Sequence, residues 1–172
     1  MAISTSNISD TTGIRVPQGA CVVIVRTERN APVVDELEAG CRAVLDELKV
    51  NHTVLTVPGA FEIPFAVKNY WDGHKYTDQK PSAFIALGTV IRGDTPHFDY
   101  VCRAVTDGIL QLNLAMPVPT IFGVLTVDHE EQARERIGGK HGHKGREAAI
   151  TALKMIGLIQ EHCTRKPRNR KK

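Results

Sequence analysis

Aromatic side chains are scarce in this chain of 172 residues: Phe, Trp and Tyr make up 5% of it, and the single tryptophan is Trp71. The chain therefore lacks the series of stacking platforms on which proteins bind single-stranded nucleic acid. No apolar run reaches the roughly 18 residues needed to cross a bilayer. Residues 1–17 are polar, include Asp10 and have no apolar core of a secretory signal. We therefore predict a soluble, cytoplasmic protein without a membrane or nucleic-acid partner.

Cysteine motifs and several common enzyme motifs are also absent. Cys21, Cys41, Cys102 and Cys163 show neither CxxC pairing nor zinc-ligand spacing. Most of them lie in apolar runs, where a free cysteine is a small core residue, and we expect a reducing compartment. The sequence has no HExxH, no GxSxG around a nucleophilic serine, and no GxGxxG after its first predicted strand.

Charge is distributed unevenly along the chain. The formal net charge is +3, but six lysines and arginines lie in the last eight residues, so the remainder is slightly acidic. We divide the chain into a flexible N-terminal segment (1–17), a single domain (18–163) and a basic C-terminal tail (164–172). The tail could contact nucleic acid or another acidic surface. A solvated chain end is the alternative that we favour.

Short β-rich runs alternate with longer helical patterns. Apolar, β-branched runs predict strands at 20–26, 52–57, 82–91 and 119–127. Helical spacing predicts helices at 32–48, 62–71, 97–114, 129–136 and 145–162, the first with Asn30 as its N-cap. This alternation predicts an α/β fold, a three-layer α/β/α sandwich around a four-stranded parallel sheet. Ligands bind such sheets at the carboxyl ends of the strands, which here are followed by loops 26–31, 58–62, 91–98 and 127–144.

Two of these loops contain residues suited to binding and proton transfer. In loop 58–62, Gly59 and Ala60 allow a ligand to approach the backbone, while Glu62 is either a ligand contact or a favourable charge at a helix start. Loop 91–98 contains Gly93, Thr95 and His97. A histidine at a helix start can transfer protons near neutral pH beside N–H groups that suit an anion, although a structural role is an equal alternative.

The segment RIGGKHGHKG (136–145) combines glycines with Arg136, Lys140 and Lys144. A positively charged, closely approachable turn of this kind suits a phosphate group. It is not a nucleotide P-loop, because no Ser or Thr follows a Gly-Lys pair and no strand directly precedes it. His141 and His143 have no carboxylate or thiolate partner nearby in the sequence, so we expect no metal site.

Taken together, these segments resemble the lumazine synthase family. VPGAFEIP (57–64), LGTVIRGDTPHFDYV (87–101), VPTIFGVLT (118–126) and RIGGKHGHKG (136–145) occur in the family's order, within a match from about Val22 to Ile159. The resemblance implies a flavodoxin-like fold and the penultimate step of riboflavin biosynthesis. In that step 5-amino-6-(D-ribitylamino)uracil condenses with 3,4-dihydroxy-2-butanone 4-phosphate to 6,7-dimethyl-8-ribityllumazine, phosphate and water. No cofactor and no metal are implied.

The resemblance also assigns roles to individual residues. His97 matches the family's proton-transfer histidine, and Arg136 matches the arginine that holds the substrate phosphate. Gly93, Asp94 and Thr95 fall in the phosphate-facing loop. The positions that match contacts to the pyrimidine and its ribityl chain are Asn30, Gly59, Ala60, Phe61, Glu62, Thr89, Val90 and Ile91.

Assembly is implied in the same way. Phe122 and Lys144 match positions that a neighbouring subunit supplies in the family. The resemblance therefore implies a homo-oligomer with active sites at subunit interfaces, either a pentamer or a sixty-subunit shell. The N-terminal segment would add a strand to a neighbouring subunit.

One substrate-binding position departs from the family pattern. Arg29 stands directly before Asn30, where the family has a Phe or Trp that stacks on the pyrimidine ring. A guanidinium plane can also stack on a ring. The alternatives are a flavin- or lumazine-binding module, a lumazine dismutase and a structural shell protein. The pair His97 and Arg136 favours the condensing enzyme, because a binding module needs no proton transfer and dismutation involves no phosphate.

Overall fold

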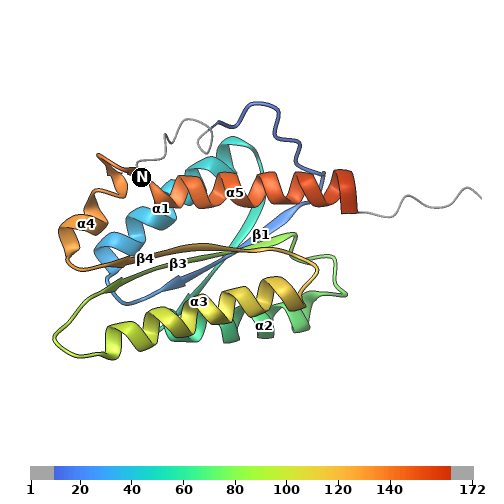
Figure 1. Ribbon diagram of the computed structural model, residues 1–172. Helices are drawn as coiled ribbons and strands as arrows, with labels where there is room; N and C mark the ends of the chain where they lie inside the picture. Colours follow the sequence, from blue (N-terminus) through green and yellow to red (C-terminus); the bar gives the residue numbers. More distant parts are fainter. Residues whose placement is uncertain (1–9, 164–172) are drawn as a thin grey trace, which may run out of the picture.

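The computed structural model describes residues 10–163 of the chain. One parallel sheet has the strand order β2-β1-β3-β4, and its strands are β1 (Cys21–Thr27), β2 (Asn51–Val57), β3 (Ala83–Ile91) and β4 (Thr120–Val127). One face of the sheet is covered by α1 (Ala31–Glu47) and α5 (Lys144–Leu158), the other by α2 (Ile63–His74) and α3 (His97–Ala115), as Figure 1 shows. The predicted three-layer α/β/α sandwich is confirmed.

Alternation along the central strands divides the core into two parts. On β3, Ile85 and Leu87 pack in the core below α1 and α5, whereas Phe84 and Ala86 pack against α2 and α3. All four side chains are fully buried. Because both faces of this strand are covered, its sequence is a continuous apolar run rather than an alternating one.

Asn30 begins α1 in a different way from the predicted side-chain cap. Its backbone is left-handed (φ 57°, ψ 41°), a conformation that asparagine tolerates, and its side chain makes no capping hydrogen bond. Instead, Asn30 Nδ2 donates to the carbonyl oxygen of Thr89 at 2.8 Å. The side chain therefore ties the loop after β1 to the end of the neighbouring strand β3.

The segment after β4 is more ordered than a simple glycine-rich turn. The short helix α4 (Glu130–Arg134) is followed by β5 (Ile137–Gly139) and β6 (Gly142–His143), which form an antiparallel hairpin. Gly138 and Gly142 have φ angles of 115° and 79°, which glycine adopts without strain. The hairpin leads directly into α5, which ends in a π-helical turn, Ile159–Cys163.

Close packing of α5 on α1 leaves no room for a side chain at Gly145, where a Cβ would lie 2.0 Å from the carbonyl oxygen of Leu37. We expect Gly145→Ala to lower the free energy of unfolding by about 3 kcal/mol, because backbone must move. Gly73→Ala in α2 is the control, since nothing lies within 4 Å of a Cβ there. Chemical denaturation measures both variants. Equal stability of the two would contradict this account of the packing.

Three sequence predictions concern the chain ends and the cysteines. Ile14 and Val16 of the N-terminal segment pack against the core below α1 and α5, and strand addition to a neighbouring subunit stays a prediction. The basic tail lies outside the described residues.

All four cysteines are free, but only Cys41 is buried, where burial raises the pKa of its thiol to about 12. The expectation that most of them are core residues was wrong. Within residues 10–163, no helix has the length and apolar character to span a membrane.

Candidate active site

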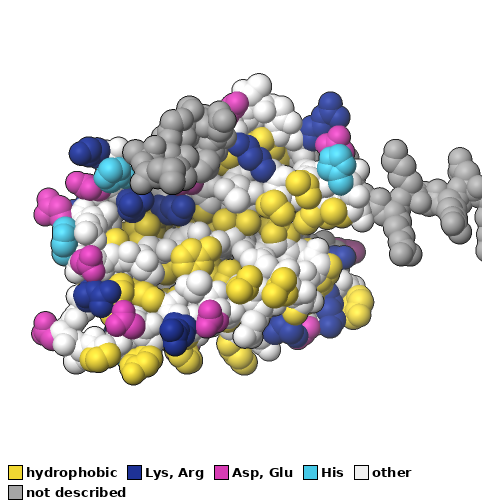
Figure 2. Space-filling view, in the orientation of Figure 1, with side chains coloured by type: hydrophobic (Ala, Val, Ile, Leu, Met, Phe, Trp, Pro, Cys, Tyr) yellow, Lys and Arg dark blue, Asp and Glu magenta, His cyan; other side chains and the backbone are white. Residues whose placement is uncertain are grey.

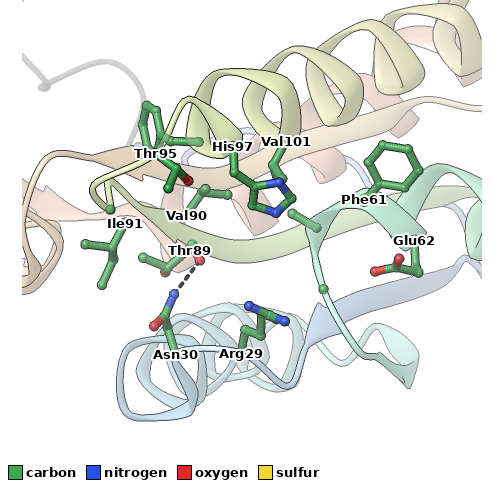
Figure 3. A pocket seen from close by; sticks show the side chains of 14 residues that line it. Arg29, Asn30, Phe61, Glu62, Thr89, Val90, Ile91, Thr95, His97 and Val101 are labelled. Carbon is green, nitrogen blue, oxygen red and sulfur yellow. Dashed lines mark hydrogen bonds between the residues drawn. The ribbon is translucent and has the colours of Figure 1, made fainter.

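A cavity of about 370 Å³ lies at the carboxyl ends of β1 and β3 (Figure 3). The connection after β1 runs over one face of the sheet and the connection after β3 over the other, so a crevice opens between these neighbouring strands. The 3₁₀ turn η2 (Ala60–Glu62) forms another wall of this cavity. The lining residues are Arg29, Asn30, Gly59, Ala60, Phe61, Glu62, Thr89, Val90, Ile91, Gly93, Thr95, His97, Phe98 and Val101.

The predicted site residues do not all line one cavity. Those of the first three loops line this cavity, apart from Asp94, which lies between two lining residues. Phe122 and Lys144 instead line a second cavity of about 550 Å³, which runs along β4 between α3 and α5. Arg136 is exposed and lines neither cavity. Within one chain, His97 and Arg136 are therefore not brought together.

His97 is the first residue of α3 and is exposed in the single chain. In Figure 3 its ring and the side chain of Arg29 point toward each other across the cavity. Among the described residues, neither the imidazole nor the guanidinium has a hydrogen-bond or ion-pair partner. Both groups are thus available to a ligand. No side chain caps the first turn of α3, which leaves N–H groups at the helix start without a side-chain acceptor.

Gly59 separates two opposite charges at the cavity wall. A Cβ at this position would lie 3.1 Å from Glu62 Oε2 and 4.0 Å from Arg29 Nε. The backbone of Gly59 is extended, so no unusual conformation requires glycine here. The carboxylate and the guanidinium give the cavity an acceptor and a donor within a short distance of each other, as a ligand with hydroxyl and carbonyl groups requires.

Arg92 fixes the loop that carries His97, a role that the sequence did not indicate. Its Nε donates to Asp128 at 2.9 Å, its Nη1 donates to Asp99 at 3.3 Å, and its guanidinium carbon lies 4.1 Å from the centre of the Phe98 ring. Asp128 is 36 residues away in the chain, so no local pattern reveals this pair. Val101 was also missed, although its place one helical turn after His97 would have put it on the same face.

Large apolar side chains are exposed on the helices beside the cavity. The exposed fractions are 62% for Phe61, 75% for Phe65, 68% for Tyr100, 56% for Leu110 and 80% for Leu114. Figure 2 shows a further band of hydrophobic side chains over β4, between α5 and α3. Contiguous exposed apolar side chains, such as those of this band, mark surfaces that bind another protein.

The two histidines of the segment 136–145 are separated by their surroundings. His141 Nε2 lies 3.4 Å from Glu135 Oε2 at the surface, whereas the His143 ring is packed against α1 at Gly40. Across residues 10–163, no three His, Cys, Asp or Glu side chains are grouped as a metal ion would require.

Known proteins resemble this chain over nearly its whole length. The family model described as 6,7-dimethyl-8-ribityllumazine synthase matches residues 19–160. A protein of that name from Porphyromonas gingivalis is 47% identical over 163 residues, which cover 92% of this chain and 98% of the relative. The protein of the same name from Parabacteroides distasonis is 42% identical, with coverages of 92% and 99%. That from Bdellovibrio bacteriovorus is 44% identical over 141 residues, with coverages of 81% and 75%.

Proposed function

The chain belongs to the 6,7-dimethyl-8-ribityllumazine synthase family, its reaction is the condensation that forms this lumazine, and we propose that the reaction takes place in the cavity beside His97. The substrates are 5-amino-6-(D-ribitylamino)uracil and 3,4-dihydroxy-2-butanone 4-phosphate, and phosphate and water are released. The observation that carries the proposal is the meeting of three separate loops around an imidazole that has no partner within the described chain.

The chemistry needs two substrates held together and protons moved. An amine attacks a ketone, phosphate leaves and a ring closes, without a change that requires a redox centre. Holding both substrates in one cavity lowers such a barrier by several kcal/mol, up to roughly 10. His97 is the group that accepts and returns protons at the reacting atoms. The carboxylate of Glu62 and the backbone at Gly59 and Ala60 bind the pyrimidine with its ribityl chain.

The phosphate is held by parts of two subunits. The loop Gly93, Asp94 and Thr95 and the uncapped start of α3 provide N–H groups on one side. Arg136 lies away from the cavity of its own chain, so it reaches a phosphate only in the cavity of another copy. A guanidinium can pair with phosphate through two parallel hydrogen bonds. Phe122 and Lys144 complete the same neighbouring site.

This division of the site predicts the kind of assembly. One subunit offers its cavity and the next offers the region of β4 and the hairpin, so two different surfaces meet in each contact. Such a heterologous contact forms a ring when its rotation closes, rather than a two-fold dimer. We propose a pentamer, either alone or within a sixty-subunit shell. The exposed apolar side chains on α2 and α3 support burial against another copy, and the free thiols support a cytoplasmic location.

The direct experiment is to mix both substrates with the purified protein. Lumazine absorbance and released phosphate should appear together in equal amounts. Incubation with 6,7-dimethyl-8-ribityllumazine alone should give no riboflavin, which distinguishes condensation from dismutation. Protein that binds the pyrimidine without forming product would favour the binding-module alternative.

Arg29 is the position at which this site departs from its family. Arg29→Trp should tighten binding of the pyrimidine substrate by about three- to tenfold, because stacking of two aromatic systems contributes about 0.5–1.5 kcal/mol beyond buried area. Arg29→Lys is the control, since it keeps the charge and removes the flat guanidinium. Calorimetric titration with the pyrimidine alone measures both variants. Unchanged or weaker binding by the Trp variant would show that the guanidinium serves this ring as well as an aromatic side chain.

A further inference from the structure

His143 occupies a gap in α1. It is the last residue of β6, and its ring lies where the side chain of residue 40 would be: a Cβ on Gly40 would lie 2.1 Å from ring atom Cε1. The Nδ1 atom is buried and has no hydrogen-bond partner among the described residues. A buried nitrogen without a hydrogen-bond partner does not stabilise the fold. The contribution of His143 to stability therefore comes mainly from the packing of its ring against Gly40.

The docked ring belongs to the hairpin that presents the proposed phosphate ligands. His143 pairs with Ile137 across the hairpin, and the N–H of Lys144 donates to the carbonyl oxygen of Arg136 at 2.7 Å. Residues 138–142 between them are exposed. Movement of the His143 ring out of its gap would therefore carry both cationic residues with it.

We propose that His143 is a positioning residue: its neutral ring, seated against Gly40, holds Arg136 and Lys144 in place for the neighbouring subunit's cavity, and protonation of the ring releases them. The inference rests on the phosphate-binding roles proposed above for these two residues. His143 itself touches no substrate.

The groups around the ring decide the direction of its pH dependence. Burial lowers the pKa of His143, and Arg146 of α5 lowers it further, whereas the residue's own backbone, Glu36 of α1 and Glu147 of α5 raise it. From β5, Ile137 is the cross-strand partner of His143, and a Cβ on Gly138 would lie 3.8 Å from ring atom Cδ2. With a folded pKa below the unfolded value of about 6.5, docking is complete above that pH and weakens as the pH falls through the folded value.

The test compares KM and kcat of four proteins between pH 5.5 and 8. His143→Ala empties the gap and should raise KM for the butanone phosphate about tenfold at pH 7.5, with KM for the pyrimidine unchanged. His143→Phe keeps a ring that cannot take up a proton. In the parent, KM for the butanone phosphate should rise as the pH falls below about 6.5, because the His143 ring becomes protonated. In His143→Phe this rise should be absent. His141→Ala, on the same hairpin but exposed and paired with Glu135, is the matched control and should behave like the parent.

Gly40→Ala probes the same contact from α1. It should raise KM for the butanone phosphate in the parent but not in the His143→Ala background, where the added methyl group meets an empty gap. An unchanged KM in both His143→Ala and Gly40→Ala, together with a raised KM in Arg136→Ala, would refute the positioning role and leave the proposed function intact. An unchanged KM in Arg136→Ala would overturn the phosphate assignment itself. Parent-like pH dependence in His143→Phe would exclude release by protonation.

Discussion

Replacement of His97 by alanine will lower kcat of lumazine formation by a factor of about 10² to 10⁴, the usual contribution of a general acid or base. The ring points into the cavity from the first residue of α3 and has no partner within the described chain, so its removal breaks no internal contact. Both KM values should stay within about threefold of the parent's, because the loss concerns proton transfer rather than binding. Steady-state kinetics with each substrate varied in turn measure this separation.

A second exposed histidine offers a matched control. His129 precedes α4, just as His97 begins α3, but it does not line the cavity. His129→Ala should therefore keep the kcat of the parent. If His97→Ala keeps kcat within about tenfold, proton transfer must be assigned to another group or to water.

The second large effect is expected for Arg136→Ala, which should raise KM for the butanone phosphate by about 10- to 100-fold. Hydrogen bonds to a charged group contribute about 1.5–3 kcal/mol, which corresponds to this range. Arg136→Lys should recover part of the loss, because it restores the charge without the paired geometry. Arg134→Ala, two residues away and paired with Glu130 at 2.6 Å on α4, is the control and should leave KM unchanged.

The two variants together test whether the site is shared between subunits. After dissociation and reassembly of a one-to-one mixture of His97→Ala and Arg136→Ala subunits, some interfaces contain both intact residues. In a ring of heterologous contacts, random mixing places them together at about a quarter of the interfaces. Activity should rise toward that fraction of the parent's. No recovery from well-mixed oligomers would show that both residues act within one chain.

The layers of the fold and the local parts of the site could be predicted from the sequence. Continuous apolar runs at β1 and β3 require cover on both faces of a sheet, and helical spacing between them supplies that cover. Gly59 to Glu62 and Gly93 to His97 are contiguous segments whose chemistry depends on neighbours in the chain. Their placement at strand ends followed from the alternation of strands and helices alone.

The contacts between residues far apart in the chain depend on the packed fold and could not be predicted from sequence patterns. Asn30 contacts Thr89, Arg92 pairs with Asp128, and the His143 ring fills the gap at Gly40 because β1 lies next to β3, β3 next to β4, and α5 packs closely on α1. The same packing puts Arg136 and Lys144 away from the cavity of their own chain. The spacing of apolar residues predicts which face of a helix or strand is buried, but it does not predict which other element packs against that face. The order of the strands and the fit of the side chains are properties of the whole packed chain.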